Sequence, residues 1–410
     1  MKKHPQFSAR QVVYALTLAA AVAFLLLGSR AAMGDREIFG AAMERDFLRA
    51  KVLTVGKAQE EAGDHVDGQG NANTVTFIPF EAKIKSGAQK GETLACVQEI
   101  NNMFALQSPP VKAGDAVLLD VMETEGGELS YLFFDYVRTS PLIFLAVLFA
   151  ALVIAFGRRK GFNTVLSLVL TILAIFIVLV PAVLTGHNIY TWSLMICVFI
   201  VLTNLLLVQG ASTKSLTAAL GCVGGVAVSG LLMLLMDKPM HITGLLDEES
   251  VFLIQITPDH PINLKATVFS MILIGSVGAL MDVTMSIASA LQEIREKEPN
   301  LPARELMRSG FAIGKDMIGT MANTLVLAYI GGSMSVILLL IHYTTGLTQL
   351  LNREMIAVEI LQSLAGSLSV VAVIPLTSFI CSVFYRQRKA VVREAFFVEE
   401  EDRMGEEEHD

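Results

Sequence analysis

About eight apolar stretches, most of them close to 20 residues long, divide the sequence of this chain. An α-helix needs roughly 20 mostly apolar residues to cross about 30 Å of hydrocarbon, and each stretch is bounded by polar or charged residues. The stretches are residues 12–27, 141–156, 165–185, 192–208, 216–236, 266–291, 317–340 and 360–384. The sequence therefore predicts an α-helical membrane protein that crosses the bilayer about eight times.

The composition agrees with this prediction and excludes other classes of protein. Hydrophobic residues make up 53% of the 410 residues and charged residues only 17%, which is not typical of a soluble protein. The formal net charge of -8 argues against a nucleic-acid partner, because binding to backbone phosphates needs a basic surface. The four cysteines, Cys96, Cys197, Cys222 and Cys381, are too far apart in sequence to indicate a disulfide framework or a thiolate metal cluster.

The first apolar stretch follows the basic start Met1-Lys2-Lys3 and permits two interpretations. It is short, and Ser29-Arg30-Ala31 resembles a small-residue cleavage site, so a cleaved signal peptide is one of them. We favour the other, in which residues 1–30 form an uncleaved signal anchor.

Lysine and arginine in the short connections set the predicted orientation. These residues accumulate on the cytoplasmic side of membrane proteins, whereas long translocated domains are largely exempt from the bias. One side carries Arg158, Arg159, Lys160, Lys214, Arg295, Lys297, Arg304, Arg308, Lys315, Arg386, Arg388, Lys389 and Arg393. The short loops of the other side carry Lys238, Lys265 and Arg353. We expect both termini in the cytoplasm of a bacterial cell, with the chain in its inner or plasma membrane.

Residues 31–138 form a polar segment that this topology places outside the cytoplasm. Turn-rich clusters separate short β-rich runs at residues 49–55, 74–84, 116–122 and 131–137. Five or six strands of this length suit a small β barrel or sandwich, and an OB-type barrel is one candidate. The segment has ten basic and seventeen acidic residues, so a solvated surface is expected rather than one that docks on anionic lipid.

The rest of the chain divides into a seven-helix membrane domain, residues 139–385, and a cytoplasmic tail, residues 386–410. The tail begins with a basic amphipathic segment and ends in an acidic run that lacks the apolar residues needed to fold. In the loop before the sixth span, residues 247–256 have the pattern of a short amphipathic surface helix.

Asp282 is the ionisable residue that lies well inside a predicted span. A charged aspartate at the centre of a lone helix costs about 2.5–3.5 kcal/mol on insertion scales, so it should face protein or water. It belongs to a small and polar stripe with steps of three or four residues: Gly275, Gly278, Asp282, Ser286, Ser289 and Glu293. The opposite face, with Ile274, Leu280, Val283 and Ile287, suits lipid or apolar packing.

The next span repeats this pattern. Asp316, Thr320 and Asn323 share one helical face, with Thr324 beside them. Asp282 and Asn323 should each lie roughly 10–14 Å from the cytoplasmic end of their spans. Because the two spans run antiparallel, the sequence predicts a shared polar pocket. Further along, the pair Gly331-Gly332 is placed to break or bend the helix.

Other interpretations of these residues remain. Gly, Ser, Thr and Asn also serve as close-packing residues between helices, which is the interpretation we favour for Ala218, Gly221, Gly225 and Ser229 of the fifth span. Asp282 and Asp316 could form the dyad of an intramembrane aspartyl protease, but Asp316 is expected at the membrane edge as a helix N-cap. The segment Gly310 to Asp316 lacks the spacing of a phosphate loop, which argues against an ATPase.

Two segments resemble the YibE/F-like family of bacterial multi-span membrane proteins. They are Gly278-Ala-Leu-Met-Asp-Val-Thr-Met-Ser-Ile-Ala-Ser-Ala-Leu-Gln-Glu-Ile294 and Gly314-Lys-Asp-Met-Ile-Gly-Thr-Met-Ala-Asn-Thr-Leu-Val-Leu-Ala-Tyr-Ile-Gly331. The resemblance is expected to extend over most of the chain, including the polar domain and Pro375. Lys315 stands where the family is expected to have arginine, which keeps the charge but loses the guanidinium geometry. The resemblance implies a topology and two signature helices, without an activity.

From these patterns we expect a permease or channel for a small solute or ion that works without ATP and without a cofactor or metal. Asp282 would bind the cation or proton, with Ser286, Ser289, Asp316, Thr320, Asn323 and Thr324 along the pathway. Gly275, Gly278, Gly331 and Gly332 would serve packing or hinge roles. The alternative is a membrane-anchored scaffold or assembly factor whose outer β domain binds an envelope protein. Neither class is an enzyme.

Overall fold

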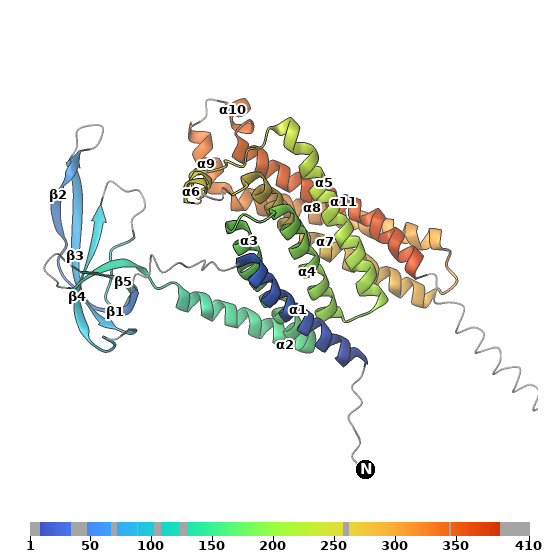
Figure 1. The fold of residues 1–410 in the computed structure, drawn as a ribbon, viewed down its shortest axis with the longest axis horizontal. Helices are drawn as coiled ribbons and strands as arrows, with labels where there is room; N and C mark the ends of the chain where they lie inside the picture. The colour runs from blue at the N-terminus through green and yellow to red at the C-terminus, as the bar shows by residue number, and fades with distance from the viewer. Residues whose placement is uncertain are drawn as a thin grey trace, which may run out of the picture. The chain divides into compact units, whose positions relative to one another are not determined.

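The computed structural model describes residues 9–33, 47–66, 72–87, 89–101, 108–123, 129–256, 262–343 and 346–385 (Figure 1). The amphipathic segment and acidic tail expected at residues 386–410 therefore lie outside the described residues. The chain forms two compact units. One combines Met1–Ile38 with Val153–Asp410, and the other is Phe39–Leu152.

The smaller unit contains a β barrel. Its strands are β1 (Phe47–Val55), β2 (Gln59–Val66), β3 (Ala72–Ile84), β4 (Thr93–Asn101), β5 (Ala116–Glu123) and β6 (Leu129–Tyr136). The four runs expected from sequence correspond to β1, β3, β5 and β6. The hydrogen-bonded order is β1-β5-β6-β4-β3-β2, and β1 also pairs with β3. Five strands thus close into a ring, and β2 pairs with β3 outside it.

The barrel interior follows from the two-residue period of its strands. Along β1, Leu48, Ala50 and Val52 are buried and their neighbours are exposed, as expected when alternate side chains point to opposite faces. They pack with Ile78, Phe80 and other apolar residues of β3, β4 and β5. Strand β4 lies between β3, to which it is antiparallel, and β6, to which it is parallel. In the pairing with β6, Val97 of β4 lies opposite Leu132 of β6.

The helical unit accounts for most of the remaining chain. Its long helices are α1 (Ala9–Met33), α4 (Ile189–Gln209), α5 (Thr213–Met240), α7 (Leu264–Lys297), α8 (Ala303–Gly332) and α11 (Glu354–Phe384). Its shorter elements are the π-helix η2 (Ala174–Leu179), α3 (Val180–Leu184), α6 (Glu248–Ile256), α9 (Met334–Tyr343) and α10 (Leu347–Leu351). Helix α6 matches the surface helix expected at residues 247–256. Helix α2 (Thr139–Leu173) begins in the smaller unit.

Helix α2 contains a break where the sequence predicts the boundary between two spans. Arg158 has φ 50° and ψ -123°, values outside the helical region. A Cβ on Gly161 would overlap the backbone oxygen of Val153, although residues eight apart in a straight helix are separated by about 12 Å. The apolar stretch Thr139–Leu184 has 46 residues. At about 69 Å it is more than twice the length needed for one straight crossing.

Within the described part of the chain, six helical stretches are long and apolar enough to cross a membrane, and up to seven if the pair α8 and α9 forms one broken span. The expected count of about eight is therefore not established by these helices. Helix α8 ends at Gly332 and α9 begins at Met334, and the two are bent by 61°. The expected single span 317–340 is thus divided immediately after the pair Gly331-Gly332.

Close packing of small residues joins α5, α7 and α11 in the core of the helical unit. A Cβ on Gly225 would lie 2.8 Å from Leu280 Cδ2 of α7 and 3.0 Å from Val373 Cγ2 of α11. Ala218 and Ser229 are also fully buried, as expected for close-packing residues. Helix α1 belongs to the same unit, and its Phe24 stacks on Phe199 of α4 with ring centroids 4.3 Å apart.

Candidate functional site

The polar stripe of α7 lies on the surface of the described helical unit. Gly275, Gly278, Asp282 and Ser286 are exposed, and Ser289 is half-buried. Asp282 is near the middle of a 34-residue helix and has no hydrogen bond or ion pair to any described residue. The residues of the sequence pattern therefore share one face of α7. The other helices of the unit do not cover Asp282.

The opposite face of α7 supplies the core. Leu280, Val283 and Ile287 are each fully buried, and Ile274 packs against the same cluster. Of the two alternatives expected for this face, lipid contact and apolar packing, the structure shows apolar packing. Burial of that face orients the helix, so that Asp282 and Ser286 point away from the buried cluster.

Helix α8 has a matching exposed face. Asp316, Thr320, Asn323 and Thr324 are all exposed, as is Gly319, at which a Cβ would meet no other atom within 4 Å. Thr320 Oγ1 donates to Met317 O at 3.0 Å, and Thr324 Oγ1 donates to Thr320 O at 2.8 Å. These bonds satisfy the hydroxyl donors within the helix, while the hydroxyl oxygens retain the capacity to accept a bond or bind a cation.

One expectation for α8 is wrong. Asp316 was expected at the membrane edge as a helix N-cap, but α8 begins at Ala303 and its N-cap is Pro302. Asp316 therefore lies more than three turns inside the helix. The error arose because the charged residues Arg304, Arg308 and Lys315 end the apolar stretch in sequence, whereas the helix itself continues beyond the apolar part.

Two contacts fix the relative position of α7 and α8. Near one end, a Cβ on Gly310 of α8 would lie 3.0 Å from Leu291 Cδ1 of α7. Near the other, the Cβ position of Gly275 abuts the Tyr329 hydroxyl of α8 and lies 3.1 Å from Gln362 Nε2 of α11. The helices are therefore antiparallel neighbours.

These contacts also place the two polar faces at a similar depth. Asp282 is seven residues from Gly275 along α7, which is about 10 Å, and Asn323 is six residues from Tyr329 along α8, which is about 9 Å. The structure thus brings the two polar segments to the same level of adjacent helices. Among the described residues, no hydrogen bond joins Asp282 to Thr320 or Asn323.

Glycines of the candidate site differ in their surroundings. Tyr329 and Gln362 approach Gly275 so closely that a side chain there would have to displace them. By contrast, a Cβ on Gly278, Gly331 or Gly332 would meet no other atom within 4 Å, so close packing does not require glycine at these positions. The Gly331-Gly332 pair instead adjoins the 61° bend between α8 and α9.

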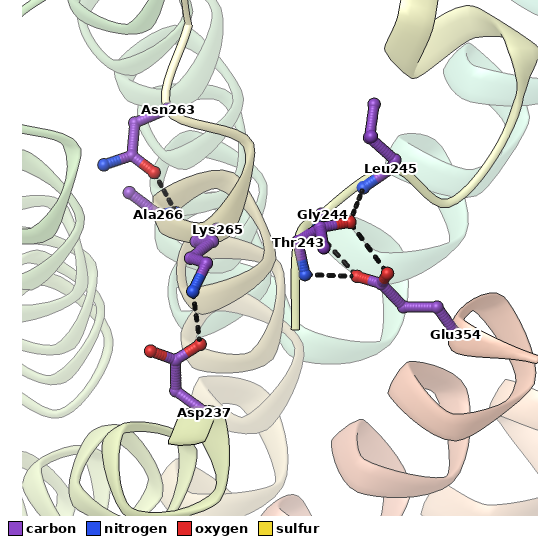
Figure 2. A network of polar contacts seen from close by, with 8 residues as sticks. All are labelled: Asp237, Thr243, Gly244, Leu245, Asn263, Lys265, Ala266 and Glu354. Carbon is purple, nitrogen blue, oxygen red and sulfur yellow. Dashed lines mark hydrogen bonds and ion pairs between the residues drawn. The ribbon is translucent and has the colours of Figure 1, made fainter. Parts of the chain in front are cut away.

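A second polar network lies where the segment after α5 meets the start of α11 (Figure 2). The sequence analysis did not predict it. Glu354 of α11 accepts hydrogen bonds from Thr243 N at 2.6 Å and Gly244 N at 2.7 Å, and from Thr243 Oγ1 at 2.8 Å. Nearby, Lys265 pairs with Asp237 at 3.2 Å. A carboxylate more than 100 residues from its partners gives no local sequence signal, and here it ties the segment after α5 to the start of α11.

The described residues contain no group of three or more His, Cys, Asp and Glu side chains that could hold a metal ion. The chemistry available along the polar faces of α7 and α8 is that of the carboxylates of Asp282 and Asp316 with hydroxyl and amide oxygens on the same faces. These are hard oxygen ligands, which suit protons and alkali or alkaline-earth cations better than soft metals.

A sequence model described as YibE/F-like protein matches residues 145–387, which is more than half of the chain. The match contains every residue of the candidate site. It does not include the β barrel, contrary to the expectation that the resemblance would extend to the polar domain. No curated protein and no solved structure matches the chain. The match covers the helical part of this membrane protein, and the chain belongs to the YibE/F-like family.

Proposed function

We propose that this protein is a permease or channel for a small solute or ion, driven by an existing gradient rather than by ATP. Its pathway runs along the adjoining polar faces of α7 and α8. Asp282 binds the transported or coupling cation or proton, and Ser286, Thr320 and Asn323 contribute neutral oxygen ligands.

The observation that carries the proposal is the exposure of Asp282 in the middle of an apolar helix. An aspartate at the bilayer centre is costly when it faces acyl chains, and such residues almost always face water or other protein groups. The helical unit itself offers Asp282 no hydrogen-bond or ion-pair partner among the described residues. A hydrated groove along α7 and α8 supplies the missing solvation, and a hydrated groove is also what ion movement requires.

The bend after Gly332 supports the same interpretation. Transporters commonly use interrupted helices near their binding sites, because broken helices offer backbone groups to the solute. Ser289, Asp316 and Thr324 extend the polar face towards the ends of the proposed pathway.

Reconstitution of the full chain in proteoliposomes tests the proposal. A trapped pH-sensitive dye reports proton flux, and tracer uptake of Na⁺, K⁺ and Mg²⁺ reports cation flux. We expect vesicles that contain the wild-type protein to show a higher flux of at least one of these ions than empty vesicles.

Asp282→Asn should reduce that flux by at least about tenfold, because it removes the charge but keeps the side-chain volume. Glu298→Gln, in the exposed turn between α7 and α8, is the matched control. Equal flux in Asp282→Asn and wild type would contradict the proposal.

A second candidate function is that of an envelope scaffold or assembly factor that acts through the barrel. The observation in its favour is an exposed aromatic pair: Phe47 and Phe134 have exposed fractions of 39% and 51%, and their ring centroids are 4.4 Å apart. Exposed apolar clusters often mark protein-binding surfaces.

A photo-crosslinking residue at Phe134 of the full chain should give a discrete adduct that the same residue at exposed Thr93 does not give. Identical adduct patterns would reject this function.

The cellular location belongs to the same proposal. The basic residues of the short connections support placement in the bacterial inner or plasma membrane, with both termini in the cytoplasm. A C-terminal alkaline phosphatase fusion should then be inactive and a C-terminal fluorescent-protein fusion bright; the reverse result would require the opposite orientation.

A further inference from the structure

A cavity of about 930 Å³ lies at the basic end of the helical unit, where α4 ends, α5 begins, and α7 and α11 end. Its lining combines polar groups, among them Ser212, Gln292, Arg295 and Tyr385, with leucines of α4. This volume is within the range of small-molecule sites. The cavity is separate from the proposed ion pathway, since Gln292 and Arg295 do not belong to the exposed polar stripe of α7.

Arg295 is the cationic group of this cavity. Its Nη1 donates to Leu301 O at 2.7 Å and to Pro299 O at 3.2 Å. Its Nε and Nη2 atoms are shielded from solvent and have no hydrogen-bond partner among the described residues. An unpaired buried donor costs free energy, and more so when it is charged. Nε and Nη2 form an edge of the guanidinium that can bind two phosphate oxygens at once, and Arg295 lines the cavity.

The polar cavity continues into an apolar groove. A second cavity of about 480 Å³ lies between α1 and α4 and is lined by Leu16, Ala20 and Phe24 of α1 and by Met195 of α4, among others. Leu202 and Leu206 of α4 line both cavities, so the two spaces adjoin. From Leu206 to Met195 the groove follows α4 for about 16 Å, which is close to half of the roughly 30 Å hydrocarbon thickness. This is the depth of one leaflet.

We propose that these two cavities together bind one phospholipid, with its phosphate at Arg295 and an acyl chain in the groove between α1 and α4. The groove is open to the membrane, since Leu16 and Leu202 have exposed fractions of 63% and 40%. A polar, cationic pocket that continues into an apolar groove at the end of membrane helices is complementary to a phosphate headgroup attached to a chain. Exposed Glu296 at the rim accepts a hydrogen bond from Gln292 Nε2 at 2.8 Å, and it favours a headgroup that also carries an amine.

Native mass spectrometry of the full chain, stripped of lipid in detergent, tests the proposal with three probes. Dioleoyl phosphatidylethanolamine carries both phosphate and chains, dioleoylglycerol carries chains alone, and phosphoethanolamine carries the headgroup alone. We expect only the complete phospholipid to be retained with one-to-one stoichiometry. Equal retention of dioleoylglycerol would remove the role of Arg295. Equal binding of phosphoethanolamine would indicate a site for a soluble phosphate compound and would overturn the lipid assignment.

Two variants separate the headgroup from the chain. Arg295→Gln should weaken phospholipid retention about tenfold, the loss expected for a charge-assisted bidentate pair. Because Arg295 also bonds to carbonyls of the α7–α8 turn, Ala20→Trp provides an independent test: it fills the groove without touching that turn. It should weaken retention of the phospholipid to a similar extent. Lys297→Gln is the control, since Lys297 is exposed and pairs with Glu293. Retention unchanged in Ala20→Trp, or lowered equally by Lys297→Gln, would contradict the proposal.

Discussion

Among individual side chains, the surroundings of Asp282 could be predicted from the sequence only in part. Its position in an apolar span and its small, polar neighbours at helical spacing identify the face on which it lies. Helical periodicity cannot show which neighbouring helix covers a face, because that depends on contacts far apart in the chain. The sequence predicted a polar pocket shared by two neighbouring spans, and in the structure the polar faces of α7 and α8 are exposed on the described helical unit.

Cys96 gives a prediction about reactivity outside the membrane-spanning segments. Burial in the barrel raises the pKa of its thiol to about 12. The neutral thiol is therefore retained in the folded state at pH 8, whereas an unfolded cysteine has a pKa near 8.5 and is partly thiolate. Cys96 as the single cysteine, after replacement of the other three by alanine, should react at least about tenfold faster with iodoacetamide in denaturant than in the native protein. Equal rates would mean that the thiol is not buried.

Glu354 gives a prediction about stability. It accepts two backbone N–H bonds and one hydroxyl bond from Thr243 and Gly244, and a hydrogen bond to a charged group contributes about 1.5–3 kcal/mol net to stability. Glu354→Gln removes the charge and one acceptor oxygen, so it should lower the free energy of unfolding by about 1–3 kcal/mol. Thermal unfolding of the full chain in detergent measures the change. Glu248→Gln, an exposed residue of α6, is the control; equal melting temperatures of the two variants would argue against the role of the network.

Among the secondary-structure elements, periodicity predicted those with strong patterns. Strand β1 alternates between buried and exposed residues, and its pattern was found from sequence. Strand β2 was missed because Glu60, Glu61 and Asp64 leave it without an apolar face, and it is stabilised by pairing with β3 outside the closed ring. Strand pairing of this kind is a tertiary effect, which local propensity does not contain.

The bend between α8 and α9 gives a prediction about conformational freedom. Alanine is favoured over glycine by about 1 kcal/mol in a helix, and a Cβ on Gly331 or Gly332 meets no atom within 4 Å. The double variant Gly331→Ala/Gly332→Ala should therefore keep or raise the melting temperature. If the bend serves the pathway, the same variant lowers ion flux several-fold in proteoliposomes. Gly157→Ala, also without a nearby atom at the Cβ position, is the control. Unchanged flux in the double variant would remove the bend from the mechanism.

For the complete chain, composition and hydropathy were enough to predict a membrane protein with a separate β domain. They could not fix the number of crossings, because α2 breaks at Arg158 and α8 is followed by a bent helix. Both features depend on backbone geometry at a few residues. The proposed function requires that the polar faces of α7 and α8 line a space that contains water.

Thiol accessibility in the bilayer tests this claim most directly. Ser286→Cys, in a chain whose four native cysteines are replaced by alanine, is reconstituted in liposomes and treated with a charged, membrane-impermeant methanethiosulfonate. Such reagents need a hydrated thiol, because the thiolate is the nucleophile and does not persist in hydrocarbon. We expect Ser286→Cys to be modified, and Phe379→Cys, an exposed apolar position of α11, to remain unmodified. If Ser286→Cys is as unreactive as Phe379→Cys, no hydrated pathway runs along α7.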